Sequence, residues 1–177
     1  MNELERFAEV RTFIFDVDGV LTNSQLLVLE DGKLLRQVSV RDGFAIKRAL
    51  AAGYRVALIT GGRSTGVTER FRALGVTDIY SGIRDKVAAY QDFKARYGLD
   101  DGEILYMGDD LPDYEVMRLV GFPVCPRDAC PEILALAKYV SGLGGGAGAV
   151  RDVIERVLRN HGNWLPHSDD EPLPTSG

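Results

Sequence analysis

Three short apolar runs, each followed by a polar loop that contains glycine, constrain the fold of this chain more than any other feature. The runs cover residues 11–15, 55–59 and 103–107. Their length and composition are typical of buried strands. Helical patterns alternate with them, at about residues 43–53, 64–74, 84–98 and 111–121. This alternation predicts an α/β fold, in which a doubly wound parallel sheet carries helices on both faces and binds ligands beyond the carboxyl ends of its strands.

One segment breaks the alternation of strands and helices. Residues 25–40 contain two apolar stretches on either side of an Asp-Gly pair and predict a β-hairpin beside the first loop. Residues 142–148 are rich in glycine and predict a flexible loop before a final amphipathic helix. We expect residues 1–161 to form one domain, and residues 162–177, which are acidic and contain three prolines, to form a flexible tail.

The charge balance argues against two classes of partner. The 177 residues include 21 basic and 26 acidic side chains, a net charge of -5, and no basic run that could neutralise a nucleic-acid backbone. No stretch approaches the roughly 18 consecutive apolar residues of a membrane span, and residues 1–6 contain no basic region that leads into an apolar one. We therefore expect a cytoplasmic protein with no nucleic-acid partner and no membrane partner.

The strongest local signal is Asp16-x-Asp18-Gly19, directly after the first apolar run. Two carboxylates at the end of a rigid strand can act on one phosphoryl group. Asp16 could attack phosphorus and form a mixed anhydride, while Asp18 could protonate the departing oxygen and later deprotonate the hydrolytic water. Gly19 permits the tight turn of the backbone that this arrangement requires.

A phosphate beside carboxylates requires a cation, and Mg²⁺ suits the position because it prefers oxygen ligands and keeps several waters. Asp109, in the loop after the third apolar run, is a candidate for the second carboxylate ligand beside Asp16. Asp113 is a candidate for a supporting acid, and Asp110 for a group outside the direct ligands. The pattern therefore predicts a magnesium site shared by two loops.

Two further segments complete the candidate site. Thr60 and Gly61 close the second apolar run, where a hydroxyl and free backbone N–H groups could hold phosphate oxygens. Lys86, at the start of a predicted helix, could place its ammonium between the nucleophilic carboxylate and the transferred phosphate. In this interpretation the catalytic residues are Asp16, Asp18, Thr60 and Lys86, and Gly61 binds phosphate.

These segments, in this order along about 100 residues, resemble the four motifs of the haloacid dehalogenase phosphatases. Each motif alone is a weak signal, but the ordered set after successive strands is a specific one. The resemblance implies hydrolysis of a phosphomonoester through an aspartyl-phosphate on Asp16. It also implies that Mg²⁺ is held by the carboxylates of Asp16 and Asp109 and by the backbone carbonyl of Asp18.

Four longer matches narrow the resemblance. They are Asp16–Thr22, Val40–Gly43, Gly108–Asp113 and Gly145–Asp152. Together they are similar to the 3-deoxy-D-manno-octulosonate 8-phosphate (KDO 8-phosphate) phosphatases, over roughly residues 8–160. Members of that family lack a large cap domain, carry a β-hairpin and assemble as homotetramers whose neighbouring subunits cover each active site. The resemblance implies a substrate that is a phosphorylated sugar acid of lipopolysaccharide synthesis.

The sequence departs from this family at one position. After the Thr-Gly motif the KDO 8-phosphate phosphatases often carry Arg and their nine-carbon relatives carry Glu, whereas this chain has Gly62. Arg63 could supply a cation to the substrate carboxylate, or it could be a solvent-facing residue at the start of a helix. Arg41 is a second candidate, although a salt bridge to Asp42 or to a neighbouring subunit is the favoured interpretation for it. A phosphatase for a nine-carbon ulosonate 9-phosphate therefore stays open as an alternative.

Two interpretations without phosphatase activity also compete. A phosphorylatable receiver module combines a doubly wound sheet with acidic residues, a Thr and a Lys, but its acidic pair precedes the phosphorylated Asp, an order that this chain reverses. A non-catalytic regulatory relative would have lost the nucleophile or its partners, whereas Asp16, Asp18, Lys86 and Asp109 are all present. Since a fold alone does not assign a function, rapid hydrolysis of small phosphate esters is the property that separates these alternatives from an enzyme.

Overall fold

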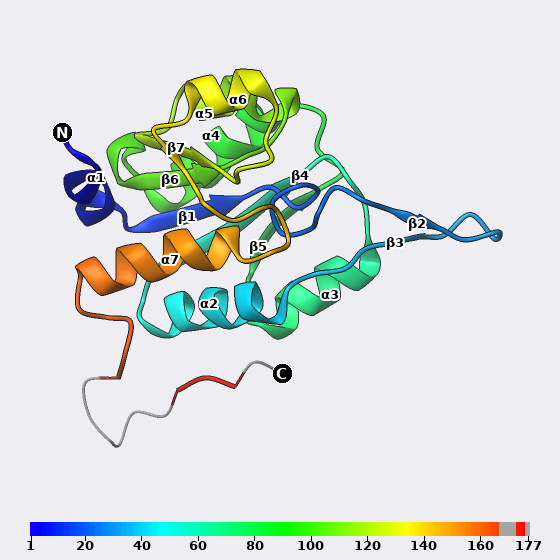
Figure 1. Ribbon diagram of the computed structural model, residues 1–177, viewed down its shortest axis with the longest axis horizontal. Helices are drawn as coiled ribbons and strands as arrows, with labels where there is room; N and C mark the ends of the chain where they lie inside the picture. Colours follow the sequence, from blue (N-terminus) through cyan, green and yellow to red (C-terminus); the bar gives the residue numbers. More distant parts are fainter. Residues whose placement is uncertain (167–172, 176–177) are drawn as a thin grey trace.

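A six-stranded parallel sheet forms the centre of the computed structural model, which describes residues 1–166 and 173–175 (Figure 1). Its strand order is β5-β4-β1-β6-β7-β8, and each neighbouring pair is parallel. The strands are β1 (Thr12–Phe15), β4 (Arg55–Thr60), β5 (Asp78–Ser81), β6 (Ile104–Met107), β7 (Phe122–Cys125) and β8 (Tyr139–Val140). The three predicted strands correspond to β1, β4 and β6, which lie side by side. The predicted doubly wound parallel sheet is confirmed, whereas β5, β7 and β8 were not predicted.

Helices cover both faces of the sheet. Successive side chains of a strand point to opposite faces, and both faces of this sheet are apolar. Phe13 and Phe15 of β1 contribute to one core, and Ile14 contributes to the other. The first face packs against α1 (Glu3–Glu9), α2 (Val40–Ala51), α3 (Thr65–Ala73) and α7 (Ala149–Asn160). The second face packs against α4 (Lys86–Tyr97), α5 (Tyr114–Met117) and α6 (Pro131–Leu136) (Figure 1). Two short 3-10 turns are η1 (Asp101–Glu103) and η2 (Leu111–Asp113).

Several helix boundaries differ from the predicted ones. α2 begins at Val40, because the Ser39 side chain accepts a hydrogen bond from the Asp42 N–H and caps the helix. The prediction of one helix over 111–121 was wrong: the segment divides into η2 and the single turn of α5, since the chain re-enters the sheet at Phe122. Within the described residues, no helix has both the length and the apolar character needed to cross a membrane.

The predicted hairpin is present and projects from the body of the molecule (Figure 1). Its antiparallel strands are β2 (Leu27–Val28) and β3 (Leu34–Leu35). Gly32 has a φ of 84° in the turn, a conformation that a residue without Cβ adopts without strain. The ladder is much shorter than the predicted span of 25–40, because residues 25–26 before it and 36–39 after it have no regular secondary structure.

The glycine-rich segment 142–148 packs against the loop that follows β1. The Gly146 N–H donates to the Val20 carbonyl at 2.9 Å, and a Cβ on Gly145 would lie 2.0 Å from the Gly19 carbonyl oxygen. The prediction of a flexible loop was therefore wrong. Glycine is required here because two stretches of backbone lie in direct contact, and this contact supports the loop between β1 and the hairpin.

The packed domain extends beyond the predicted boundary at residue 161. Trp164 is buried against Phe44, with ring centroids 6.1 Å apart, and the Arg48 guanidinium donates to the Trp164 carbonyl at 2.9 Å. The first residues of the predicted flexible tail, 162–177, are therefore held against α2. Residues 167–172 and 176–177 of that tail lie outside the described residues.

Candidate active site

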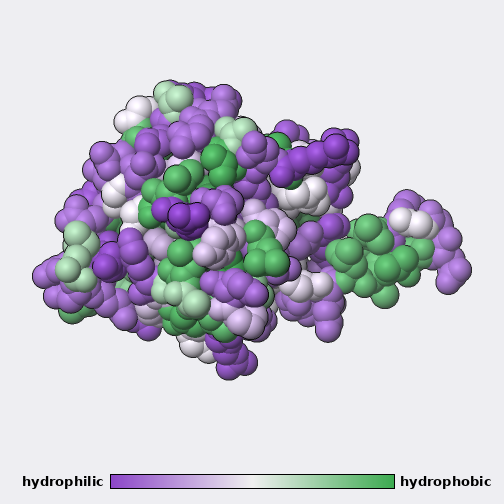
Figure 2. Space-filling model, turned by 90° about the horizontal axis from the view of Figure 1, so that it is seen from above, coloured by the Kyte–Doolittle hydropathy of each residue, from purple (hydrophilic) through white to green (hydrophobic). Residues whose placement is uncertain are grey.

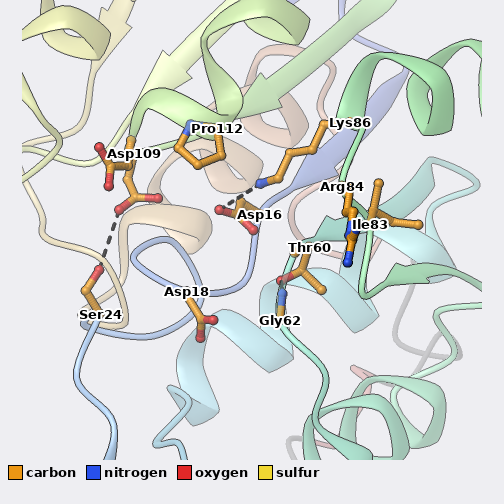
Figure 3. A pocket seen from close by; sticks show the side chains of 12 residues that line it. Asp16, Asp18, Ser24, Thr60, Gly62, Ile83, Arg84, Lys86, Asp109 and Pro112 are labelled. Atoms are coloured by element: carbon orange, nitrogen blue, oxygen red, sulfur yellow. Dashed lines mark hydrogen bonds and ion pairs between the residues drawn. The ribbon is translucent and has the colours of Figure 1, made fainter.

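Three loops meet at the carboxyl edge of the sheet, where β4, β1 and β6 are neighbours. The direction of winding reverses at β1, since β4 pairs with one side of it and β6 with the other. Ligands bind at this position in doubly wound sheets. The loops enclose a cavity of about 520 Å³ (Figure 3). Its lining consists of Asp16, Asp18, Ser24, Thr60, Gly61, Gly62, Ile83, Arg84, Lys86, Asp109, Asp110 and Pro112.

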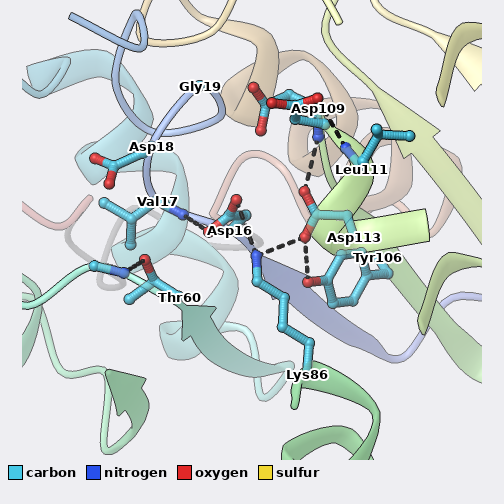
Figure 4. A network of polar contacts seen from close by, with 12 residues as sticks. Asp16, Val17, Asp18, Gly19, Thr60, Lys86, Tyr106, Asp109, Leu111 and Asp113 are labelled. Carbon is cyan, nitrogen blue, oxygen red and sulfur yellow. Dashed lines mark hydrogen bonds and ion pairs between the residues drawn. The ribbon is translucent and has the colours of Figure 1, made fainter. Parts of the chain in front are cut away.

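A buried network of charges lies at the base of the cavity (Figure 4). The Lys86 ammonium is 3.0 Å from Asp16 Oδ2 and 2.7 Å from Asp113 Oδ1. The Tyr106 hydroxyl donates to Asp113 Oδ1 at 2.8 Å, and the Asp109 N–H donates to Asp113 Oδ2 at 3.1 Å. Asp113 is fully buried, and both of its oxygens already accept hydrogen bonds. It therefore orients Lys86 and the loop of Asp109 from beneath the cavity.

Rigid elements bring Asp16 and Lys86 face to face. Asp16 directly follows β1, and its Oδ1 accepts a hydrogen bond from the Val17 N–H at 2.7 Å, which leaves Oδ2 toward the ammonium. Lys86 is the first residue of α4, whose N-terminus is capped by Asp85 through a bond from the Ala88 N–H. The two charged groups are thus positioned before any ligand binds, as efficient catalysis requires.

Crowded negative charge shifts the pKa values in this network. Burial and the Asp113 carboxylate raise the pKa of Asp16 well above its ordinary value. Burial and the carboxylates of Asp113 and Asp110 raise the pKa of Asp109 to about 7. Burial works to lower the pKa of Lys86, but the Asp16 and Asp113 carboxylates outweigh it and hold that pKa above its usual value. Burial is the largest cause for the two carboxyl groups, and the neighbouring carboxylates raise the pKa of all three groups.

The excess of negative charge suits a divalent cation. One oxygen from each of Asp16, Asp109 and Asp113 lies within 4.8 Å of the other two. Since both oxygens of Asp113 are engaged by neighbouring donors, Asp16 and Asp109 are the better ligands. Mg²⁺ is commonly bound by one or two carboxylates together with water and substrate phosphate. The residues present therefore fit the magnesium ion that the sequence predicted.

Close contact between two loops places Asp109 beside Asp16. Gly19 has a φ of 88°, and a Cβ on it would lie 1.8 Å from Asp109 Oδ2. The Asp109 carbonyl accepts a hydrogen bond from the Cys130 N–H at 2.8 Å, which ties its loop to the start of α6. Glycine at position 19 is therefore required both for the turn and for the approach of the carboxylate.

The loop after β4 is anchored by backbone hydrogen bonds. The Thr60 carbonyl accepts from the Ile83 N–H and the Gly62 carbonyl from the Gly82 N–H, both at 3.0 Å. The Thr60 hydroxyl accepts from the Gly62 N–H at 3.2 Å and lines the cavity together with Gly61. This loop can therefore present a hydroxyl and backbone groups to a phosphate from a fixed position.

The carboxylate of Asp18 points away from Asp16 (Figure 4) and is held from the hairpin side. Arg36, just after β3, donates from Nε to Asp18 Oδ1 at 2.7 Å and from Nη2 to Asp18 Oδ2 at 3.2 Å. The sequence did not predict Arg36 as part of the site. A single arginine in an expected surface hairpin carries no signal of its own, and only the way the hairpin folds back reveals its partner.

The arginines considered for a substrate carboxylate lie in different places. Neither Arg41 nor Arg63 lines the cavity: Arg41 lies in a separate hollow beside α7, and Arg63 covers Gly82, where its Nε would be 2.3 Å from a Cβ. Arg84, which the sequence did not single out, is exposed and lines the cavity (Figure 3). Its position two residues before Lys86 was the signal that could have identified it.

Comparison with known proteins places this geometry in a family. A model of haloacid dehalogenase-like hydrolases matches residues 71–150. The 3-deoxy-D-manno-octulosonate 8-phosphate phosphatase KdsC of Yersinia pestis is 38% identical over 155 residues, which cover 88% of this chain and 83% of that protein.

Solved structures of relatives share the fold. The crystal structure of the Yersinia pestis phosphatase has a TM-score of 0.88 at 37% identity and covers 91% of this chain and 87% of its own. The Moraxella catarrhalis phosphatase, solved in complex with magnesium, phosphate and KDO, has a TM-score of 0.88 at 32% identity over 93% of this chain and 95% of its own. The chain therefore belongs to the 3-deoxy-D-manno-octulosonate 8-phosphate phosphatase family of haloacid dehalogenase-like hydrolases.

Proposed function

We propose that this protein is a magnesium-dependent phosphatase that converts 3-deoxy-D-manno-octulosonate 8-phosphate to the free sugar acid and phosphate. Its relatives are named after this substrate. The observation that carries the proposal is the setting of Asp16 at the base of the cavity. Its Oδ2 lies 3.0 Å from the Lys86 ammonium, and oxygens of two further carboxylates lie within 4.8 Å. A carboxylate held in this way is suited to attack phosphorus.

In the first half of the reaction, Asp16 forms a bond to phosphorus while the bond from phosphorus to the sugar oxygen breaks. Asp18, on the cavity wall, gives a proton to the departing sugar oxygen. Lys86 stabilises charge on the transferred phosphoryl group, and Thr60 and Gly61 hold its oxygens. When bound by Asp16, Asp109 and the Asp18 carbonyl, Mg²⁺ supplies the remaining positive charge.

In the second half, water attacks the phosphorus of the aspartyl-phosphate. Asp18, now a carboxylate, takes the proton from this water, and the bond between phosphorus and Asp16 breaks. Phosphate is released, and Asp18 is protonated again for the next turnover. The two carboxylates therefore have separate roles, and the fold keeps them separate by pairing Asp16 with Lys86 and Asp18 with Arg36.

The second anionic group of a sugar acid requires its own cation. Arg84 is suited to this role because it is exposed and lines the same cavity as Asp16 and Lys86. A guanidinium can bind a carboxylate through two parallel hydrogen bonds. The roles predicted for Arg41 and Arg63 stay predictions, since neither residue lines this cavity.

A homotetramer is the second part of the proposal, and the hairpin supports it. Leu27 and Val28 are 62% and 65% exposed, and Leu34 and Leu35 are 45% and 46% exposed. These aliphatic side chains form a patch on the projecting arm at the right of Figure 2. A second copy of the chain would remove this patch from water. Light scattering that gives the mass of a monomer at all concentrations would contradict assembly, and cell fractionation would test the predicted cytoplasmic location.

The first experiment measures phosphate release with Mg²⁺ from KDO 8-phosphate, nine-carbon ulosonate 9-phosphates and hexose phosphates. We expect a clear preference for KDO 8-phosphate and a loss of turnover after thorough chelation, restored by Mg²⁺. A preference for a nine-carbon substrate would replace the proposed substrate and keep the chemistry. If none of these substrates released phosphate, the proposed phosphatase activity would be contradicted and a regulatory role would be favoured.

A second experiment tests the role of Arg84. We expect Arg84→Gln to lower kcat/KM for KDO 8-phosphate about 10- to 100-fold, the range of a lost hydrogen-bonded charge pair, and to leave kcat/KM for glucose 6-phosphate nearly unchanged. Arg118→Gln, on the exposed surface of the α5 turn, is the matched control for loss of one arginine. An equal loss on both substrates would show that Arg84 does not recognise the carboxylate.

A further inference from the structure

We propose that Arg36 is a positioning residue that fixes the carboxylate of Asp18 for proton transfer, and that Gly62 is required because this pair occupies the space beside it. The inference rests on the phosphatase chemistry proposed above but not on the identity of the sugar. It concerns three residues from three segments: the loop after β1, the end of the hairpin and the loop after β4.

The two side chains meet in a geometry that orients a carboxylate. Arg36 donates from Nε and Nη2 to the two oxygens of Asp18, at 2.7 Å and 3.2 Å. Two parallel bonds from a planar guanidinium set the plane of the carboxylate, which a single bond from an ammonium would not do. The Arg36 side chain is only 5% exposed, whereas that of Asp18 is 37% exposed. The pair therefore has a buried, fixed member and a member that faces the cavity.

Arg36 acts through Asp18 and not on the substrate. It is absent from the lining of the cavity that contains Asp16, Lys86 and Asp109, although Asp18 is part of that lining. Its guanidinium lies behind the carboxylate, on the side of the hairpin. A residue in this place can determine where the proton donor points without contact with the reacting atoms.

The remaining nitrogen of the guanidinium, Nη1, is buried and makes no hydrogen bond to the described residues. Arg36 borders a small internal cavity of about 10 Å³, whose walls include the hydroxyl-bearing residues Thr60, Ser64, Thr68 and Ser81. This volume is close to the minimum for one water molecule, and the hydroxyls provide acceptors for it. Such a water would satisfy Nη1 and fix the guanidinium against the loop after β4.

The same geometry accounts for Gly62, the position at which the sequence departs from its family. A Cβ at this position would lie 2.9 Å from Asp18 Oδ2 and 3.1 Å from Arg36 Nη2. The first distance is shorter than real Cβ contacts, so any side chain would displace one member of the pair. The glycine at position 62 therefore has a structural reason of its own, apart from substrate specificity. It leaves room for a charge pair that reaches the site from the hairpin.

The test compares substrates that differ in their need for a proton donor. For Arg36→Gln we expect kcat/KM to fall about 10- to 100-fold for glucose 6-phosphate, whose alkoxide leaves poorly, and less than about threefold for 4-nitrophenyl phosphate, whose phenolate leaves without protonation. Arg36→Lys should restore part of the loss. Lys33→Gln removes a cation from the tip of the same hairpin, where Lys33 pairs with Asp31, and should change neither value.

Two further variants separate positioning from general damage to the fold. In an Asp18→Asn background, Arg36→Gln should cause no additional loss, since its effect passes through the Asp18 carboxylate. Gly62→Ala should reproduce the substrate-dependent loss of Arg36→Gln while its thermal unfolding temperature and its affinity for Mg²⁺ stay close to those of the wild type.

Three results would overturn the inference: equal losses on the two substrates, a further loss in the Asp18→Asn background, or full activity of Arg36→Gln on glucose 6-phosphate. Failure of the proposed function gives a different result. An enzyme that hydrolyses glucose 6-phosphate and 4-nitrophenyl phosphate but not KDO 8-phosphate would contradict the proposed substrate alone, because the comparison for Arg36 uses neither KDO nor its phosphate.

Discussion

The catalytic centre and the hairpin place charge and apolar surface in opposite environments. In the centre, the side chains of Asp16, Lys86 and Asp113 are only 10%, 5% and 0% exposed, although charged groups are seldom buried without close partners. In the hairpin, Leu27 and Val28 are more than half exposed, although aliphatic side chains are usually buried. The two regions are joined by the bond between Arg36 and Asp18.

The two regions favour binding partners of different kinds. Burial and neighbouring carboxylates raise the pKa of Asp109 to about 7. The centre has more carboxylates than ammonium groups, and this excess favours a divalent cation. The hairpin has uncovered apolar surface, which favours a protein surface. Changes in the centre should therefore alter chemistry, and changes to the exposed aliphatic side chains of the hairpin should alter assembly.

The largest effect should come from Asp16→Asn. An amide is a poor nucleophile, so we expect phosphate release to fall by about 10⁴-fold or more, in the range measured for removal of a nucleophile. Asp31→Asn in the hairpin turn is the matched control and should keep full turnover, because Asp31 pairs with Lys33 at the surface and does not line the cavity. More than a few per cent of wild-type turnover in purified Asp16→Asn would overturn the aspartyl-phosphate mechanism.

A smaller loss is expected for Lys86→Met, which keeps the length of the side chain and removes its charge. We expect kcat to fall about 10²- to 10⁴-fold, since in the proposed mechanism the ammonium stabilises charge on the transferred phosphoryl group. Steady-state kinetics with Mg²⁺ held in excess would measure the effect. Lys33→Met in the hairpin should change kcat less than twofold. Equal losses of kcat in the two variants would contradict a catalytic role that is specific to Lys86.

Asp42 provides a buried carboxylate outside both regions. Burial raises the pKa of Asp42 from 3.8 to about 6, although a bond from the Arg151 N–H opposes the shift. A raised folded-state pKa contributes stability that is complete below about pH 4 and is lost as pH rises through about 6.

We therefore expect the free energy of unfolding of the wild type, relative to Asp42→Asn, to decrease by up to about 3 kcal/mol between pH 4 and pH 7. Denaturant unfolding at several pH values would measure this difference, and phosphate release should be unaffected at pH 7. If the free energies of unfolding of the two proteins changed in parallel with pH, the raised pKa of the buried Asp42 carboxyl group would be contradicted.

The smallest effect on the fold should come from the exposed hairpin pair, Leu27→Ser with Leu35→Ser, which lie opposite each other in the ladder. We expect the free energy of unfolding of the monomer to change by about 0.5 kcal/mol or less, because both side chains are exposed. The mass of the assembled protein should fall toward that of one chain in light scattering. A large loss of monomer stability, with no change of mass, would show that the hairpin packs within its own subunit.

Much of the fold was predictable because three strands carry strong local signals. β1, β4 and β6 are short apolar runs that end in polar loops, and they form the centre of the sheet. β5 and β8 escaped prediction because they lie at the edges of the sheet and are only partly buried, so their sequences lack a continuous apolar pattern. The glycine-rich segment 142–148 was misjudged for a related reason, since composition does not distinguish a flexible loop from a tight contact between backbones.

The sequence by itself predicted the residues of the candidate active site. Asp16, Asp18, Lys86 and Asp109 follow strands or begin a helix in an order that few other functions require, and parallel strands necessarily bring their carboxyl ends to one edge.

Only the tertiary structure decided how these groups are held. The bond from Arg36 to Asp18, the absence of room at Gly62 and the place of Arg84 on the cavity wall depend on how the hairpin and the loop after β5 fold back toward the sheet. Contacts between segments distant in sequence leave no local periodicity, and a single charged or small residue has no pattern from which its partner could be inferred.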